Sequence, residues 1–294
     1  MSPWENHLNE HRDQYLKELW DFLRIASISS LSDHEPHVME AAEWVGARMQ
    51  AAGIESVGIM PTGGHPVVYG DWLHAPGKPT VLVYGHFDVQ PVDPLDLWDS
   101  PPFEPTLREG RIYARGATDD KGNMFIPITV TESILKAEKS LPLNLKFLFE
   151  GQEEIGSPQL PHFIAANREL FACHLVLSAD GTQRGEDQPA MVLGTRGLAS
   201  LYVDVQGPDH DLHSGTYGGT IANPIHALIQ ILDSMHDQEG RVSIEGFYDD
   251  VRALTDEERA ELARVPFDEA EYLNQLGAIS LFGEPGFTTY ERAW

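Results

Sequence analysis

The first 180 residues alternate between amphipathic stretches and short apolar runs. In the stretches around residues 16–23, 38–49 and 123–138, apolar side chains recur every three or four positions, which is the spacing of one helix face. Runs that are apolar on both faces are typical of central strands in a sheet that helices cover. Such runs occur at Pro66–Tyr69, Thr80–Tyr84, Leu143–Phe149 and Leu175–Leu177. This order predicts an α/β fold with a mostly parallel sheet flanked by helices.

The pattern changes in the last third of the chain. Leu198–Val205 alternates apolar and polar side chains, which predicts a half-solvated strand. Asn223–Pro224 has the composition of a helix start, with an N-cap followed by proline at the first helical position. Arg241–Phe247 suggests a second strand. We therefore expect an α/β domain over residues 1–196 and part of a smaller α+β domain over residues 197–294.

Composition excludes several classes of partner. The 294 residues include 20 basic and 46 acidic side chains, so the formal net charge is 20 − 46 = −26. A field of this sign repels nucleic acid and anionic lipid, and we expect neither as a partner. The N-terminal residues are polar, and no apolar run approaches the roughly 20 residues that span a bilayer. These features predict a cytoplasmic protein without a secretion signal.

Chemically active side chains follow the predicted strands. His86 and Asp88 come directly after the run Thr80–Tyr84 and, being two residues apart, face the same side of an extended backbone. His86 could then bind a metal while Asp88 orients the other imidazole nitrogen or a neighbouring group. Taken alone, this pair has a simpler interpretation, which is a structural histidine beside a surface aspartate.

Three further acidic motifs lie either directly after an apolar run or just before a predicted helix. Asp119 and Asp120 lie between glycines before a helix, Glu153 and Glu154 follow Leu143–Phe149, and Asp180 follows the last run. Each motif alone is compatible with a helix cap or a solvated turn. Together they would be costly to bury unpaired, and a divalent cation removes that cost. Mixed histidine and carboxylate ligands favour zinc, with manganese or cobalt as alternatives.

The motifs taken together resemble those of one family of zinc peptidases. The segments GHFDV (85–89), RGATDDKG (115–122) and EGQEEIGS (150–157) match it in order and spacing. The family contains carnosinase-like dipeptidases, aminoacylase, acetylornithine deacetylase and succinyl-diaminopimelate desuccinylase. The segments WDSPPFEP (98–105) and DLHSGTYGG (211–219) resemble the dipeptidase branch. An aspartate at position 180 is also typical of the peptidases, and implies a dipeptide or short peptide as substrate.

The resemblance implies a role for each metal-site residue. His86 and Asp180 would bind one zinc ion, Asp119 would bridge two, and Glu154 would bind the second. Glu153 would be the general base that takes a proton from the water between the metals and passes it to the leaving amine. The peptide bond between Asp119 and Asp120 is expected to be cis.

Two further roles follow from the same resemblance. Asp88 would support His86 and Glu153. His213 lies in the segment that resembles a lid, and in such enzymes this histidine reaches the active site of a partner subunit and polarises the scissile carbonyl. A homodimer formed through the lid domain is therefore expected.

The resemblance stops at the end of the chain. Enzymes of this family continue beyond the lid, and the returning segment supplies a last histidine ligand. We therefore expect an N-terminal portion with one well-ligated metal position and weak or no activity. Two alternatives stay open from the sequence, namely an N-acyl amino acid deacylase of the same fold and a non-catalytic metal-binding or dimerisation module.

Overall fold

A computed structural model describes residues 1–181, 183, 189–192, 197, 198 and 200–292. It divides the chain into two units, Met1–Val192 and Leu193–Trp294, which are described separately. The predicted domain boundary at 196/197 falls on residues 193–196, which lie outside the described part.

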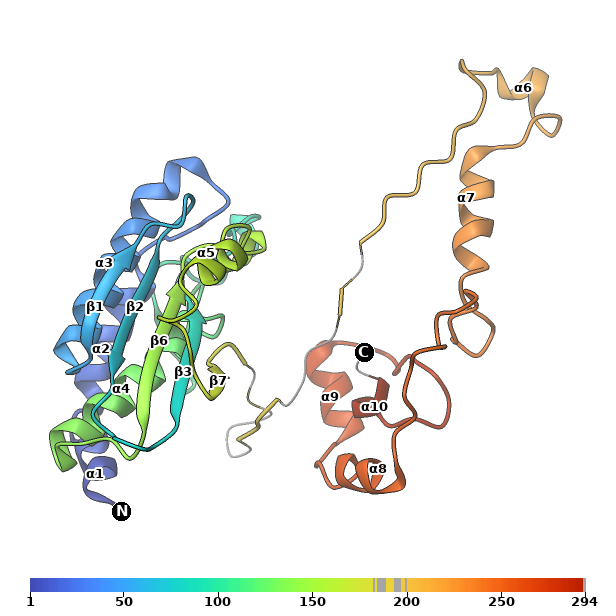
Figure 1. The fold of residues 1–294 in the computed structure, drawn as a ribbon. Coiled ribbons are helices and arrows are strands. Elements are labelled where there is room, and N and C mark those ends of the chain that lie inside the picture. The colour runs from blue at the N-terminus through green and yellow to red at the C-terminus, as the bar shows by residue number, and fades with distance from the viewer. Residues whose placement is uncertain (182, 184–188, 193–196, 199, 293–294) are drawn as a thin grey trace. The chain divides into compact units, whose positions relative to one another are not determined.

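The first unit is built on a mixed sheet (Figure 1). Its described strands follow the order β1-β2-β6-β3-β7. β3, β6 and β7 run parallel, whereas β1 pairs antiparallel with β2 and β2 with β6. The α/β class is therefore confirmed, and the parallel part is the half that carries the strand-end motifs. The strand bounds are Glu55–Met60 (β1), Val67–Trp72 (β2), Thr80–His86 (β3), Asn144–Glu150 (β6) and Leu175–Ser178 (β7).

Helices cover both faces of this sheet. On one face Val68, Val83 and Phe147 pack against apolar side chains of α2 and α3 and against Met124 and Ile128 of α4. On the other face the alternate strand positions, such as Val67 and Leu82, pack with α5 and Phe171. Successive side chains of a strand point to opposite faces of the sheet, so the sheet separates two hydrophobic cores. The helix bounds are Pro3–Glu10 (α1), Arg12–Leu23 (α2), Glu35–Ala51 (α3), Lys121–Glu138 (α4) and Leu160–Ala166 (α5).

Helix ends follow the sequence signals closely. Gly53 directly follows Ala52, the C-cap of α3, and has a φ of +88°. Glycine adopts this left-handed conformation without strain, which is why it commonly ends helices. α4 begins at Lys121, two residues earlier than predicted, and Pro127 lies in its second turn. β7 forms as predicted but is an edge strand, and its apolar side chains are 46–59% exposed.

A short hairpin between β3 and α4 was not predicted. β4 (Thr106–Arg108) pairs antiparallel with β5 (Arg111–Tyr113). The two residues between them, Glu109 and Gly110, have φ values of +50° and +81°. Positive φ at both central positions is the geometry that matches the twist of a two-residue hairpin. The strands are too short to give a periodic hydrophobic signal in the sequence.

The second unit is helical in its described residues. α7 (Pro224–Asp233) begins as predicted, with the Asn223 side chain accepting a hydrogen bond from the Ile225 N–H. The predicted strands Leu198–Val205 and Arg241–Phe247 are wrong for the described residues of this unit, where the only β pairing is an isolated bridge between His236 and Val242; residue 199 of the first strand lies outside the described part. A segment in which apolar and polar residues alternate forms part of a sheet only when another strand pairs with it. The other helices are Ser214–Tyr217 (α6), Asp256–Leu262 (α8), Glu269–Leu276 (α9) and Thr289–Arg292 (α10).

No helix within the described residues is both long and apolar enough to span a membrane.

One buried ionic group joins the helices of the first unit. Arg48 of α3 is 7% exposed and bonds to Glu18 of α2 (2.7 Å) and to Glu132 of α4. Its guanidinium also lies over the rings of Tyr15 and Phe125, at 5.7 and 5.5 Å from their centroids. This arginine therefore neutralises two carboxylates from different helices.

We predict that Arg48→Met lowers the free energy of unfolding by about 3–5 kcal/mol, because it leaves two partly buried carboxylates without a counter-charge. The control is Arg24→Met, which removes an arginine that is 45% exposed and paired with Asp21. That change should cost at most about 1 kcal/mol. Urea unfolding of both variants measures the difference, and equal costs would contradict the role given to Arg48.

Candidate metal centre

The centre begins at the carboxyl end of β3, where His86 is fully buried. Its Nδ1 lies 3.1 Å from the carbonyl oxygen of Asp88. A carbonyl oxygen only accepts, so Nδ1 is the donor, and the Nε2 nitrogen is directed to the remaining acidic groups. The backbone carbonyl of Asp88 thus sets the orientation of the His86 ring, and the spacing of two residues brings that carbonyl within reach.

Three of the predicted ligands come together around this nitrogen. Nε2 of His86 is 2.9 Å from Oδ1 of Asp119 and 3.9 Å from Oδ2 of Asp180. One donor atom from each of these residues lies within 4.8 Å of the others. One imidazole and two carboxylates form a donor set that suits zinc or another divalent ion. The assembly of acidic groups around a buried histidine fits a cation chemically.

The Asp88 side chain connects β3 to the motif after β6. Its buried carboxylate accepts the backbone N–H groups of Glu153 (3.1 Å) and Glu154 (3.1 Å). These bonds hold the turn Glu153–Ile155 beside the histidine, and they place Oε2 of Glu153 4.0 Å from Nε2 of His86. Asp88 therefore acts through the backbone of the turn as well as through His86.

Glu154 does not join the three-ligand group in the described structure. Its carboxylate accepts a hydrogen bond from Nε2 of Gln90 at 2.8 Å. The charge of Asp119 still acts on it, since burial first and then that charge raise the pKa of Glu154. Its role as ligand of a second metal stays a prediction.

Several supporting side chains were not singled out from the sequence. Oδ2 of the buried Asp120 accepts the backbone N–H of His86 (3.1 Å). Asn123 donates to the carbonyl oxygens of Thr118 and Gly181, and so links the loops that carry Asp119 and Asp180. A local signal existed only for Asp120, which adjoins a predicted ligand. Asn123 acts between segments 58 residues apart, a contact that a single sequence does not reveal.

Lys121 is another supporting residue. It is fully buried, and its Nζ donates to the carbonyl oxygens of Phe22 (3.2 Å) and Ile25 (2.6 Å) at the end of α2. Burial lowers the pKa of Lys121 to about 7. The side chain therefore anchors the start of α4, and with it the aspartates directly before it. The peptide bond between Asp119 and Asp120 is cis, as expected.

The charges in the centre shift the protonation of its residues. Burial alone lowers the pKa of His86, but the hydrogen bond and charge of Asp88 and the charges of Asp120 and Glu153 outweigh it and raise this pKa to about 10. This raised pKa favours the protonated ring, in which Nε2 can donate to Oδ1 of Asp119 at 2.9 Å. Burial also raises the pKa of Glu153.

His213 belongs to the second unit and is exposed. Its Nδ1 accepts the N–H of Gly215 at 3.1 Å, so the proton of the neutral ring is on Nε2. In this tautomer the Nε2–H is the donor of the ring. The function predicted for this donor involves a partner subunit and stays a prediction.

Comparison with known proteins identifies the family of this chain. Residues 82–280 match the model of peptidase family M20/M25/M40, and this stretch includes every site residue predicted from the sequence. The chain belongs to this family. The M20 assignment confirms the resemblance derived from the strand-end motifs.

Curated relatives and solved structures support the same assignment. The chain is 32% identical to the Cys-Gly metallodipeptidase dug1 of Schizosaccharomyces pombe, over 97% of this chain and 63% of the relative. It is 36% identical to the human Beta-Ala-His dipeptidase, over 71% of this chain and 42% of that protein. It therefore spans less than two thirds of these relatives. The fold matches an M20 family metallo-carboxypeptidase of Sulfolobus solfataricus with a TM-score of 0.75 and 34% identity, over 94% of this chain and 61% of that one.

We predict that zinc binding releases protons and tightens as pH rises. A metal at Nε2 displaces the His86 proton, and this nitrogen is protonated below a pKa of about 10. The dissociation constant should therefore fall about tenfold per pH unit between pH 7 and 9 for this one proton. Calorimetric titration in buffers of different ionisation enthalpy counts the protons. The variant His86→Ala should lose both the tight binding and this proton, whereas zinc binding without proton release at pH 7 would contradict the assignment.

Proposed function

We propose that this chain carries the catalytic metal centre of a metal-dependent dipeptidase, which hydrolyses the amide bond of dipeptides or short peptides. The observation that carries this proposal is the position of Glu153. Its carboxylate lies 4.0 Å from the same His86 nitrogen around which Asp119 and Asp180 gather. A base beside a three-ligand metal position is the arrangement that metal-assisted hydrolysis needs.

The proposed ligands are His86, Asp119 and Asp180 for one ion, and Asp119 with Glu154 for a second. Zinc bound there would polarise the scissile carbonyl and lower the pKa of water, and manganese or cobalt could replace it. Glu153 then takes the proton of the attacking water and delivers it to the leaving amine. Its raised pKa brings this group nearer to neutral pH, which favours both transfers.

The names of the relatives favour a peptide substrate. Two of them are named as a Cys-Gly and a Beta-Ala-His dipeptidase, and a similar structure is titled as a metallo-carboxypeptidase. Asp180 agrees with the peptidase branch. We further propose that residues 1–196 form the catalytic domain and residues 197–294 part of a lid, through which a homodimer brings His213 to the partner's centre. A cytoplasmic location stays a prediction.

The variant Glu153→Gln should lower kcat by about 10²–10⁴, because it removes the base and keeps the volume of the side chain. Zinc affinity should stay near that of the unmodified chain, since no ligand is lost. The control Asp119→Ala should lose zinc and turnover together. Release of amino acids from dipeptides gives the rate, and a Glu153→Gln variant with a near-normal rate would show that the base is another group.

We also predict that these 294 residues bind one zinc ion tightly and hydrolyse dipeptides slowly. The described residues bring three ligands to one ion, whereas the second position relies on Asp119 and on Glu154, which is hydrogen-bonded to Gln90. Zinc titration and assays of dipeptides against N-acetyl amino acids measure both properties. Two tightly bound ions with fast hydrolysis would contradict this prediction, and a preference for N-acetyl amino acids would favour a deacylase.

A further inference from the structure

The side chain of Asn123 connects the two loops that carry Asp119 and Asp180. Its Nδ2 nitrogen donates to the carbonyl oxygen of Thr118 at 2.7 Å and to that of Gly181 at 2.9 Å. Thr118 directly precedes Asp119, and Gly181 directly follows Asp180. The two hydrogen bonds therefore join the backbone beside one proposed metal ligand to the backbone beside another.

A side-chain amide is chemically suited to this connection. A backbone carbonyl only accepts hydrogen bonds, so the atom of Asn123 that contacts both carbonyls is the nitrogen. Its NH₂ group has two hydrogens, and each loop accepts one of them. A serine or threonine hydroxyl has a single hydrogen, and an ionised aspartate has none. Among side chains of similar size, asparagine is the one that can donate to both loops at once.

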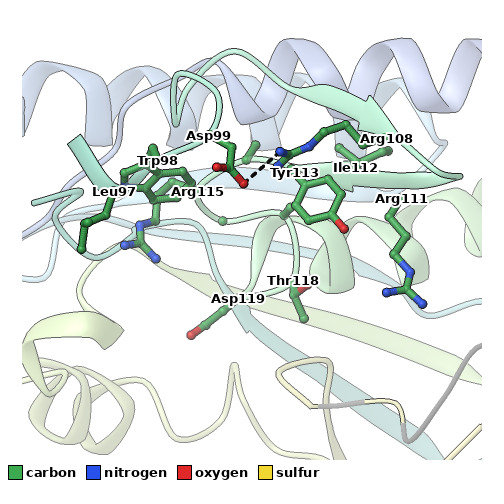
Figure 2. Close-up of a pocket in the computed structure, with 13 residues that line it drawn as sticks. Leu97, Trp98, Asp99, Arg108, Arg111, Ile112, Tyr113, Arg115, Thr118 and Asp119 are labelled. Carbon is green, nitrogen blue, oxygen red and sulfur yellow. Dashed lines mark hydrogen bonds and ion pairs between the residues drawn. The ribbon is translucent and has the colours of Figure 1, made fainter. Parts of the chain in front are cut away.

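The loop before α4 is the first of the two connected segments. Residues 114–119 and the hairpin β4–β5 line a pocket of about 640 Å³, and Figure 2 shows Thr118 and Asp119 next to each other at the end of this loop. Asn123 lies in the first turn of α4, so its bond to Thr118 fixes the loop to the helix. The side chain of Asp119 is 66% exposed, so packing against neighbouring side chains restrains it only weakly.

The segment after β7 is the second. The N–H of Ala179 donates to the carbonyl oxygen of Tyr84 at 2.7 Å, which extends the pairing of β7 with β3 to the residue before Asp180. The bond from Asn123 to Gly181 then attaches the residue after Asp180 to α4. This aspartate is therefore held by the sheet on one side and by the helix on the other.

The two carboxylates need such support because like charges repel each other. Donor atoms of Asp119, Asp180 and His86 all lie within 4.8 Å of one another. A cation offsets the repulsion between the ionised aspartates only once it has bound. A connection between the two loops that exists before binding lowers the cost of assembling the ligands around the ion.

We propose that Asn123 is a positioning residue for the metal centre, which holds the Asp119 and Asp180 loops at the separation that a bound cation needs. It acts through the backbone next to the two ligands. The proposal rests on the proposed function, since it assigns both aspartates to the same ion. It adds to that function a determinant of metal affinity outside the set of ligands.

The test measures the zinc affinity of the 294-residue chain by competition with a chelator, with His86→Ala as the background for other binding sites. Asn123→Ala should weaken zinc binding by about 10–100-fold, which is the range for partners that orient metal ligands. Alanine is a strong helix former, so α4 should persist in this variant. Asn123→Gln keeps both donors on a longer side chain and should recover part of the lost affinity.

Asn167→Ala is the matched control. Asn167 is half-buried like Asn123, and its Nδ2 also donates to a backbone carbonyl, that of Phe163 at 2.8 Å. This bond stays within the end of α5 and joins no separate loops. The control variant should keep the zinc affinity of the unmodified chain.

Hydrogen exchange before zinc is added separates positioning from a general structural role. In Asn123→Ala, exchange should become faster at residues 118–123 and 179–181, while the melting temperature stays close to that of Asn167→Ala. An unchanged zinc affinity, an equal loss in Asn167→Ala, no recovery in Asn123→Gln, or faster exchange throughout the first unit would overturn the proposal.

The same measurements distinguish this proposal from the proposed function. If zinc affinity depends on Asn123 but no dipeptide is hydrolysed, the proposed function fails and the positioning role stands. If hydrolysis depends on zinc and on Glu153 while Asn123→Ala keeps full zinc affinity, only the role of Asn123 is wrong. An unmodified chain that binds no zinc would overturn both.

Discussion

The centre depends on the buried carboxylate of Asp88. Its two oxygens accept the N–H groups of Glu153 and Glu154, and its backbone carbonyl accepts from Nδ1 of His86. One residue therefore fixes the end of β3 and the turn after β6 relative to each other. Adjacent parallel strands bring their carboxyl ends to one edge of a sheet, but they do not set the distance between side chains. Asp88 sets that distance for Glu153, the proposed base, and for His86, a proposed metal ligand.

The same edge gathers carboxyl groups that a bound cation would stabilise in their charged form. Asp120 and Glu150 are fully buried, each has one carboxylate oxygen without a partner among the described groups, and burial raises the pKa of both. His86 responds by retaining a proton. A divalent ion in the same position would supply more positive charge than that proton, and would therefore offset more of the cost of burying these carboxyl groups.

The sequence predicted the parts of this molecule whose signals are local. The helix at Asn223–Pro224 and the strands at Thr80–Tyr84 and Leu143–Phe149 follow from caps and from continuous apolar runs. The strands predicted at Leu198–Val205 and Arg241–Phe247 were wrong for the described residues, because alternation is also present where no neighbouring strand supplies hydrogen bonds. The bonds of Asn123 and Lys121 were not predictable, since they join segments that only the fold brings together.

The loop between the hairpin and α4 connects all of these features. It places Asp119 among the three proposed metal ligands, and the Asp120 side chain accepts the backbone N–H of His86. A Cβ atom at Gly122 would lie 1.9 Å from the carbonyl oxygen of Ala117, so only glycine permits the tight return of this loop into the helix. Lys121 then fastens it to the end of α2. Because this short segment is anchored at both ends, Asp119 keeps a fixed position relative to His86 and Asp180.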